Sequence, residues 1–196
     1  MSKDRLLTGT IALDAPVYRA GSARRSGAEF GVVRGAAQAI GRIHWSPPAN
    51  LHVTTKFIGE FAENRFPELQ AALEKMPERP PIEVTVAKVG FFPNAHSARV
   101  FWCGIEAPGL EALAADTDAS TSSVGVAKEE RPFSPHLTLA RIKERLDLAP
   151  LRNAIAAAPS LDFGRFTARS FFLYRSQLRP TGSVYTKFAE FPFSKR

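Results

Sequence analysis

Several stretches of the chain have the alternation of apolar and polar side chains that is typical of strands with one buried face. We predict five strands from this pattern, at residues 6–13, 82–89, 99–105, 163–174 and 184–191. Residues 91–97 read as a connection, which makes the strands on either side of it an antiparallel hairpin. Residues 179–182 carry the Pro and Gly of a turn between the last two strands.

Helical spacing of apolar residues predicts helices over 64–76 and 108–119, and an Ala-rich stretch predicts another over 148–158. Residues 17–40 are rich in Ala, Gly and Arg and are expected to hold a further helix. The polar residues 120–130 predict a mobile loop. Helices therefore interrupt antiparallel strands, which is the order of an α+β protein.

Two strings of the chain, residues 51–60 and 135–144, nearly repeat each other, with His, Thr, Ile and Glu at the same offsets. In a strand, residues i and i+2 point to the same face. His52 and Thr54 therefore share one face of their strand, and His136 and Thr138 share one face of theirs. A single His-x-Thr is more often a buried histidine beside a β-favouring threonine, but two copies with matched flanks favour a functional pocket.

The repeat also predicts the architecture. We expect one domain over residues 1–196, built as a bilobal α+β fold with two pseudo-symmetric antiparallel β-sheet lobes and flanking helices around a central cleft. No linker rich in Gly, Ser or Pro divides the sequence into independent domains.

Composition limits the partners and the cellular compartment that we expect for this domain. The net charge of +7 suits an acidic partner such as nucleic acid, although simple solubility explains it equally well. Cys103 is the only cysteine, so no intramolecular disulfide can form, and its apolar surroundings predict a buried thiol. We see no signal peptide and no apolar run long enough to span a membrane, and we expect a cytoplasmic protein.

The paired strings suit acid–base chemistry better than the alternatives. They hold too few His, Cys, Asp or Glu at short spacing for a zinc site, so no metal and no cofactor is expected. The chain has no Gly-x-Ser-x-Gly elbow, Walker A loop or Gly-x-Gly-x-x-Gly. Two histidines can instead remove one proton and donate another, while two threonine hydroxyls bind anionic oxygens, which fits displacement at phosphorus.

At this point the chain resembles a known family, the two-histidine (2H) phosphoesterases, and within it the RNA 2′,3′-cyclic phosphodiesterases, also called 2′-5′ RNA ligase-like proteins. The resemblance is strongest over residues 47–60 and 131–141, and continues in residues 173–176 and 180–182 and in Tyr185. It implies a central basic cleft and metal-independent hydrolysis of a terminal RNA 2′,3′-cyclic phosphate to a 2′-phosphate. RNA 3′ ends or cyclic nucleotides would be the partners of a monomer.

Carried over by position, the resemblance makes His52 and His136 the catalytic pair, with His52 acting as acid on the 3′ oxygen and His136 activating water. Thr54 and Thr138 would hold the phosphate, Phe57 would stack on the adjacent base, and Arg141 would contact phosphate oxygens. Phe57 and Arg141 each lie five residues after a histidine, so on an unbroken strand they would face away from it. Each assignment therefore requires a bend or bulge.

Three alternatives remain open at this stage. The same scaffold could join RNA ends through 2′–5′ bonds, could cleave 2′–5′ oligonucleotides, or could bind RNA without catalysis. The near symmetry of the two strings cannot by itself say which histidine is the acid.

Overall fold

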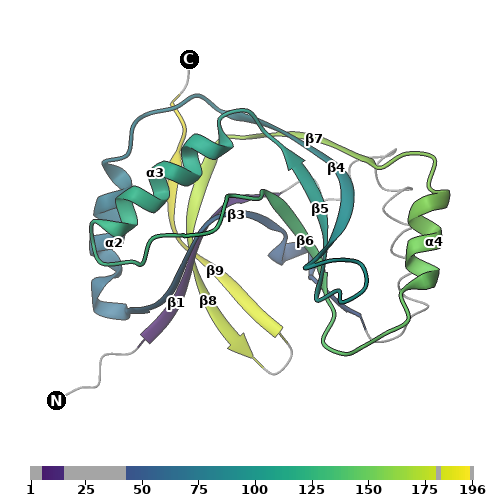
Figure 1. Cartoon of the computed structure of the whole chain (residues 1–196). Coiled ribbons are helices and arrows are strands. Elements are labelled where there is room, and N and C mark those ends of the chain that lie inside the picture. Colours follow the sequence, from purple (N-terminus) through teal and green to yellow (C-terminus); the bar gives the residue numbers. More distant parts are fainter. Residues whose placement is uncertain (1–5, 16–42, 180–181, 195–196) are drawn as a thin grey trace.

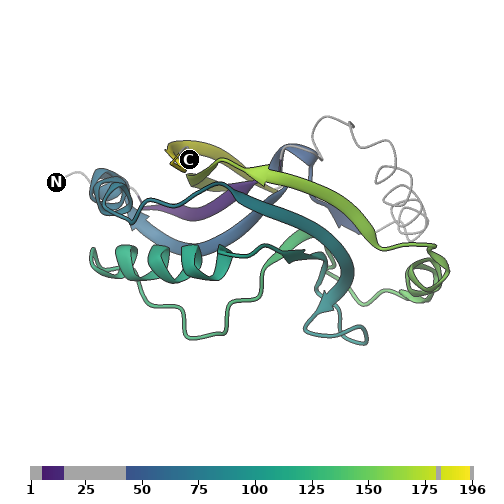
Figure 2. The same ribbon diagram turned by 90° about the horizontal axis from the view of Figure 1, so that it is seen from above.

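The computed structural model describes residues 6–15, 43–179 and 182–194 of the chain. The strands in these residues form one curled sheet in the order β7-β4-β5-β6-β3-β1-β8-β9, with β2 added against β6 (Figures 1 and 2). All of these pairings are antiparallel. The strands are β1 (Leu6–Asp14), β2 (His44–Trp45), β3 (His52–Ala62), β4 (Ile82–Phe92), β5 (Val100–Glu106), β6 (His136–Arg141), β7 (Asp162–Ala168), β8 (Ser170–Arg179) and β9 (Gly182–Pro192).

The sheet has two halves of four main strands each, β7-β4-β5-β6 and β3-β1-β8-β9. They meet where β3 lies beside β6, through a single pair, Val53 opposite Leu137. The helices are α2 (Phe66–Glu74), α3 (Leu110–Ser122) and α4 (Ala149–Ala157). Helices α2 and α3 pack together beside the β3 half, whereas α4 lies at the opposite end of the molecule (Figure 1). The predicted α+β class is confirmed, and the two lobes share one continuous sheet.

Two predicted strand boundaries are wrong. The stretch 163–174 is not one strand: β7 ends at Ala168 and β8 begins at Ser170, so the chain crosses at this point from one half of the sheet to the other. Residues Phe91 and Phe92, predicted to begin a connection, continue β4 instead, because they pair with β5 and the Phe91 ring stacks on Phe101.

The predicted loop over 120–130 is also partly wrong, because α3 continues to Ser122. Thr117 and Thr121 are fully buried there, and their hydroxyls donate to the carbonyls of Ala114 and Thr117 in the preceding turn. Polar residues that satisfy their own hydroxyls within the helix can extend it into the core. The helix predicted within 17–40 lies outside the described residues.

One hydrophobic core runs through both halves of the sheet. Its fully buried members include Val53 and Leu137 at the junction, Leu69 of α2, Leu113 of α3 and Leu151 of α4. The core thus locks the junction strands from their buried face, and the residues on their opposite face are partly exposed. No helix among the described residues is long and apolar enough to cross a bilayer.

We expect Leu137→Ala to lower the free energy of unfolding by about 2–5 kcal/mol, since it opens a cavity at the junction of the two halves. Leu6→Ala is the matched control: Leu6 is 58% exposed, Leu137 only 1%. The exposed substitution should change stability by less than about 0.5 kcal/mol. Urea denaturation measures both, and equal losses would contradict the packing described here.

Candidate active site

Four predicted site residues lie together on one face of the junction. Because β3 and β6 are antiparallel and Val53 is opposite Leu137, the same register sets His52 opposite Thr138 and Thr54 opposite His136. Val53 and Leu137 are buried, whereas these four neighbours are all partly exposed on the other face. The two imidazoles and two hydroxyls therefore surround one point between the strands, at the cross-strand spacing of a β-ladder.

Both imidazoles are held in the same way. His52 Nδ1 lies 2.6 Å from the carbonyl oxygen of Asn50, and His136 Nδ1 lies 2.8 Å from that of Ser134. A carbonyl oxygen only accepts hydrogen bonds, so each Nδ1 carries a proton and donates it. In the neutral state, Nε2 is then the unprotonated nitrogen of each ring. The two rings are thus preset to take up or give a proton at Nε2.

Aromatic side chains pack against each ring. His52 contacts Tyr185 and Tyr174, with ring centroids 4.6 and 5.9 Å away. His136 contacts Phe92 edge-on at 5.0 Å, and Trp102 lies 6.5 Å away. These contacts restrict the rotation of both rings, and they come from strands in different halves of the sheet.

A β-bulge in β3 brings Phe57 to the face of His52. Thr54 pairs with Ala12 and Lys56 with Ile11, so Thr55 is an extra residue in the ladder. Thr55 and Lys56 are both buried, and the alternation resumes with Phe57, which is 52% exposed. The bulge that the position of Phe57 requires is therefore present.

A second bulge lies at the equivalent place in β6. Thr138 pairs with Trp102 and Ala140 with Phe101, so Leu139 is the extra residue. The shift turns Arg141 to the face of His136. Arg141 is exposed, and its positive charge adds to the effect of burial in lowering the pKa of both His52 and His136.

Electrostatics distinguishes the two histidines. Burial is the main reason that the pKa of each lies below its usual value, and the carbonyl hydrogen bonds oppose that effect. Two further charges act on His52: the Asp14 carboxylate raises its pKa, and the charge of His136 lowers it. Asp14 is the register partner of His52 in β1, whereas Gly104 is the register partner of His136 in β5. The residues paired with the two histidines thus differ in charge, although they lie at equivalent positions in the two halves of the sheet.

Sequence reasoning missed Asp14, which directly follows the strand predicted over residues 6–13. Its carboxylate also forms an ion pair of 2.8 Å with Lys187, whose ammonium lies 3.7 Å from the centre of the Phe172 ring. The available signal was a single carboxylate at the end of a strand that carries no other charge. Its meaning depends on the register with His52, which the sequence does not contain.

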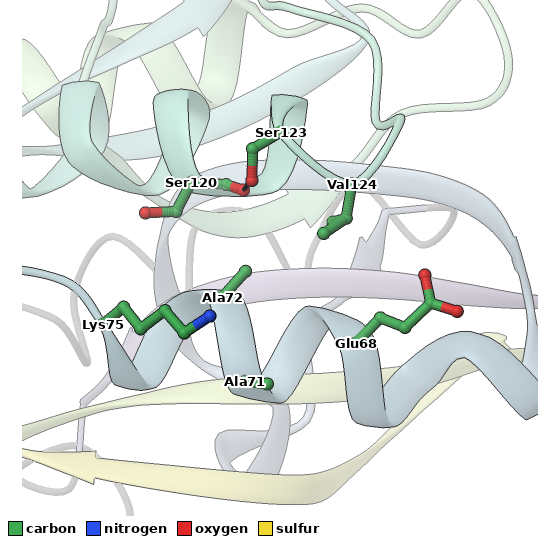
Figure 3. A pocket seen from close by; sticks show the side chains of 7 residues that line it. All are labelled: Glu68, Ala71, Ala72, Lys75, Ser120, Ser123 and Val124. Carbon is green, nitrogen blue, oxygen red and sulfur yellow. Dashed lines mark hydrogen bonds between the residues drawn. The ribbon is translucent and has the colours of Figure 1, made fainter.

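Other features of the described residues do not form a comparable site. They contain no cluster of three His, Cys, Asp or Glu side chains that could hold a metal ion. Cys103 is buried, and burial raises the pKa of its thiol, which disfavours a reactive thiolate. A hollow between α2 and the end of α3 has no histidine (Figure 3), and is lined by Glu68, Ala71, Ala72, Lys75, Ser120, Ser123 and Val124.

Comparison with solved structures identifies the class of this fold. A crystal structure of a Thermus thermophilus protein matches with a TM-score of 0.75 and 25% identity, covering 95% of this chain and 98% of that one. Escherichia coli LigT complexed with 3′-AMP has the same fold, with a TM-score of 0.70 and 20% identity over 97% of this chain and 100% of LigT. The curled sheet is therefore a phosphoesterase fold of the LigT type.

The sequence defines the family. Residues 32–102 and 105–185 match the family described as LigT like Phosphoesterase, and this chain belongs to it. A curated relative from Methanocaldococcus jannaschii, named RNA 2′,3′-cyclic phosphodiesterase, is 35% identical over 69% of this chain and 76% of its own length. A Thermus thermophilus relative of the same name is 33% identical over 74% of this chain and 73% of its own. The resemblance drawn from the paired strings is confirmed.

Burial and the neighbouring charges predict how the pKa values of His52 and His136 differ from that of a free histidine. We expect both His52 and His136 to titrate below about pH 6.5, the usual pKa of histidine. Asp14→Asn should lower the pKa of His52 further, because it removes a carboxylate that stabilises the imidazolium, and should leave His136 nearly unchanged. NMR titration of the ring protons measures both, and a parallel shift of the two rings would contradict the assigned asymmetry.

Proposed function

We propose that this protein hydrolyses the 2′,3′-cyclic phosphate at RNA 3′ ends to a 2′-phosphate without a metal ion. The proposal rests on the pairing of β3 with β6 at Val53 and Leu137, which sets the two His-x-Thr motifs side by side on one face. Both imidazoles are hydrogen-bonded through Nδ1. The shared name of the curated relatives supports the same substrate class. We further propose that the protein works as a cytoplasmic monomer.

The different surroundings of His52 and His136 support different roles for the two rings, one as general acid and one as general base. The Asp14 carboxylate partly offsets the burial that lowers the pKa of His52, which supports His52 as the general acid. His136, beside Gly104, has no such carboxylate among the described residues and is the general base. This agrees with the roles that the family resemblance implies. Arg141, which acts on both rings, balances the negative charge that builds on the phosphate.

In the proposed reaction, water attacks phosphorus and gives a proton to Nε2 of His136. The bond from phosphorus to the 3′ oxygen breaks, and Nε2 of His52 donates the proton that this oxygen takes up. The products are a 2′-phosphate and a free 3′-hydroxyl. Thr54 and Thr138 donate hydrogen bonds to the non-bridging oxygens, and exchange with solvent restores the starting protonation of the two rings.

Replacing either histidine tests the chemistry. His52→Asn and His136→Asn should each lower kcat by about 10²–10⁴-fold, since each removes one proton transfer. His96→Asn, at an exposed position in the loop between β4 and β5, is the control. The assay uses a cyclic-ended oligonucleotide in EDTA and identifies the phosphate isomer that is released.

The same assay separates the alternatives. Loss of turnover in EDTA would contradict the metal-independent mechanism. Formation of 2′–5′ linkages or cleavage of 2′–5′ oligonucleotides, with no opening of the cyclic phosphate, would assign a different reaction to this site. Tight RNA binding without turnover on any of these substrates would indicate a binding module.

The pH dependence follows from the titration of the free enzyme. Catalysis requires one ring protonated and the other neutral, so kcat/KM should be bell-shaped. Because burial lowers the pKa of both His52 and His136, the maximum should lie below about pH 6.5, and activity should fall as pH rises through the pKa of the acid. A maximum well above pH 7 would contradict the proposed pair.

The exposed Phe57 ring is the proposed platform for the base beside the phosphate. Phe57→Ala should raise KM roughly 5- to 150-fold, the equivalent of about 1–3 kcal/mol of stacking, with kcat changed much less. Phe188→Ala is the matched control, because Phe188 is similarly exposed, at 45%, but packs against Phe66 of α2. A similar rise in KM for both variants would exclude a specific platform.

A further inference from the structure

A buried lysine links the strand of one catalytic histidine to the segment that leads to the other. The side chain of Lys56 is 3% exposed, and lysine is almost never this buried unless it is paired. Its ammonium donates to the Asp118 carboxylate at 2.5 Å and to the carbonyl of Ala127 at 2.6 Å. The same oxygen of Asp118 accepts the backbone N–H of Glu129 at 3.0 Å.

On one side, this lysine belongs to the bulge that turns Phe57 into the site. The bulge pairs Lys56 with Ile11 and leaves Thr55 as the extra residue. The Thr55 hydroxyl donates to the carbonyl of Ile11 at 3.2 Å, so both bulge side chains have polar partners on the buried face. With Thr55 and Lys56 anchored there, the next side chain must point to the face of His52.

On the other side, Lys56 contacts Asp118 within α3 and Ala127 in residues 123–135, which connect α3 to β6 beside the sheet (Figure 2). Ala127 and Glu129 are held through the lysine and Asp118, and Glu129 in turn pairs with Arg131 at 2.8 Å. Near the end of this segment lies Ser134, whose carbonyl accepts the hydrogen bond that orients the ring of His136.

The charges of Lys56 and Asp118 stabilise the contact between them. Burial opposes ionisation of Asp118, but the hydrogen bonds from Lys56 and from the N–H of Glu129 outweigh it and lower the pKa of the carboxyl. The equivalent bulge in β6 has no such device, because Leu139 and Ala140 are apolar and buried. Within the described residues, the link therefore exists on only one side of the pseudo-symmetric junction.

We propose that Lys56 is a positioning residue for the reaction: through Asp118 and Ala127 it holds the approach to His136 in register with the strand that carries His52 and Phe57. Lys56 itself does not touch the substrate, since its ammonium lies on the buried side of β3. The kinetic part of this inference rests on the proposed function, whereas the structural part can be tested without any substrate.

The test compares Lys56→Met, which keeps most of the side-chain volume and removes the charge, with Arg65→Met. Arg65 is a matched control, because it also donates to a carbonyl of the same connection, that of Val124 at 2.9 Å, but at the end beside the hollow of Figure 3. We expect Lys56→Met to lower kcat by about ten- to hundredfold, since small misplacement of a catalytic group has effects of this size. Arg65→Met should leave kcat within about twofold of the wild type.

A second measurement reports the position of His136 directly. The ¹⁵N shifts of the ring nitrogens show which nitrogen carries the proton in the neutral form. In the wild type His136 should be protonated at Nδ1, and in Lys56→Met it should move toward the Nε2–H form that free histidine prefers. The ring of His52 should keep its Nδ1 proton in both proteins, because Asn50 lies before the bulge.

These outcomes separate the two proposals. A wild-type protein without turnover would overturn the proposed function, and the ¹⁵N shifts would still decide the role of Lys56. Unchanged kcat and an unchanged His136 tautomer in folded Lys56→Met would overturn the positioning role, as would equal losses in Arg65→Met. If Lys56→Met does not fold, Asp118→Asn replaces it with the same expected direction in kcat and tautomer, and no change in either would overturn the role.

Discussion

The arrangement of the site depends on a single backbone contact, the pairing of Val53 with Leu137 between β3 and β6. The main strands of the two halves are otherwise anchored by longer ladders within their own half. Because side chains alternate across a strand, one fixed pair determines which four neighbours share the open face. A slip of one residue in β6 would turn His136 and Thr138 to the buried face and separate them from His52 and Thr54.

Around this shared backbone the two halves carry different surroundings. His52 has a carboxylate in the adjacent strand and two tyrosines against its ring, whereas His136 has a glycine and a Phe–Trp pair. A symmetric frame can thus support an asymmetric reaction, because protonation states are set by what the neighbouring strands supply. The family of this chain and the names of its relatives fit that chemistry.

Much of this could be predicted from the sequence, for reasons visible in particular residues. His52, Thr54, His136 and Thr138 repeat at offsets that alternate with apolar positions, so their shared faces follow from strand geometry alone. The positions of Phe57 and Arg141 required bulges whose existence depends on partners in other strands. Asp14 and Lys56 escaped notice for the same reason: their significance comes from contacts with residues distant in sequence. The split between β7 and β8 was hidden because only Arg169 separates the two strands and aromatic residues lie on both sides of it.

The carbonyl hydrogen bonds of the two imidazoles affect how the sequence around the site can change in evolution. Each ring is oriented by a main-chain oxygen two residues before it, not by another side chain. A peptide oxygen is present whatever amino acid occupies that position, so no single replacement at Asn50 or Ser134 deletes the acceptor itself. The orientation of the two rings therefore depends on the course of the backbone, and neighbouring side chains can change without altering it.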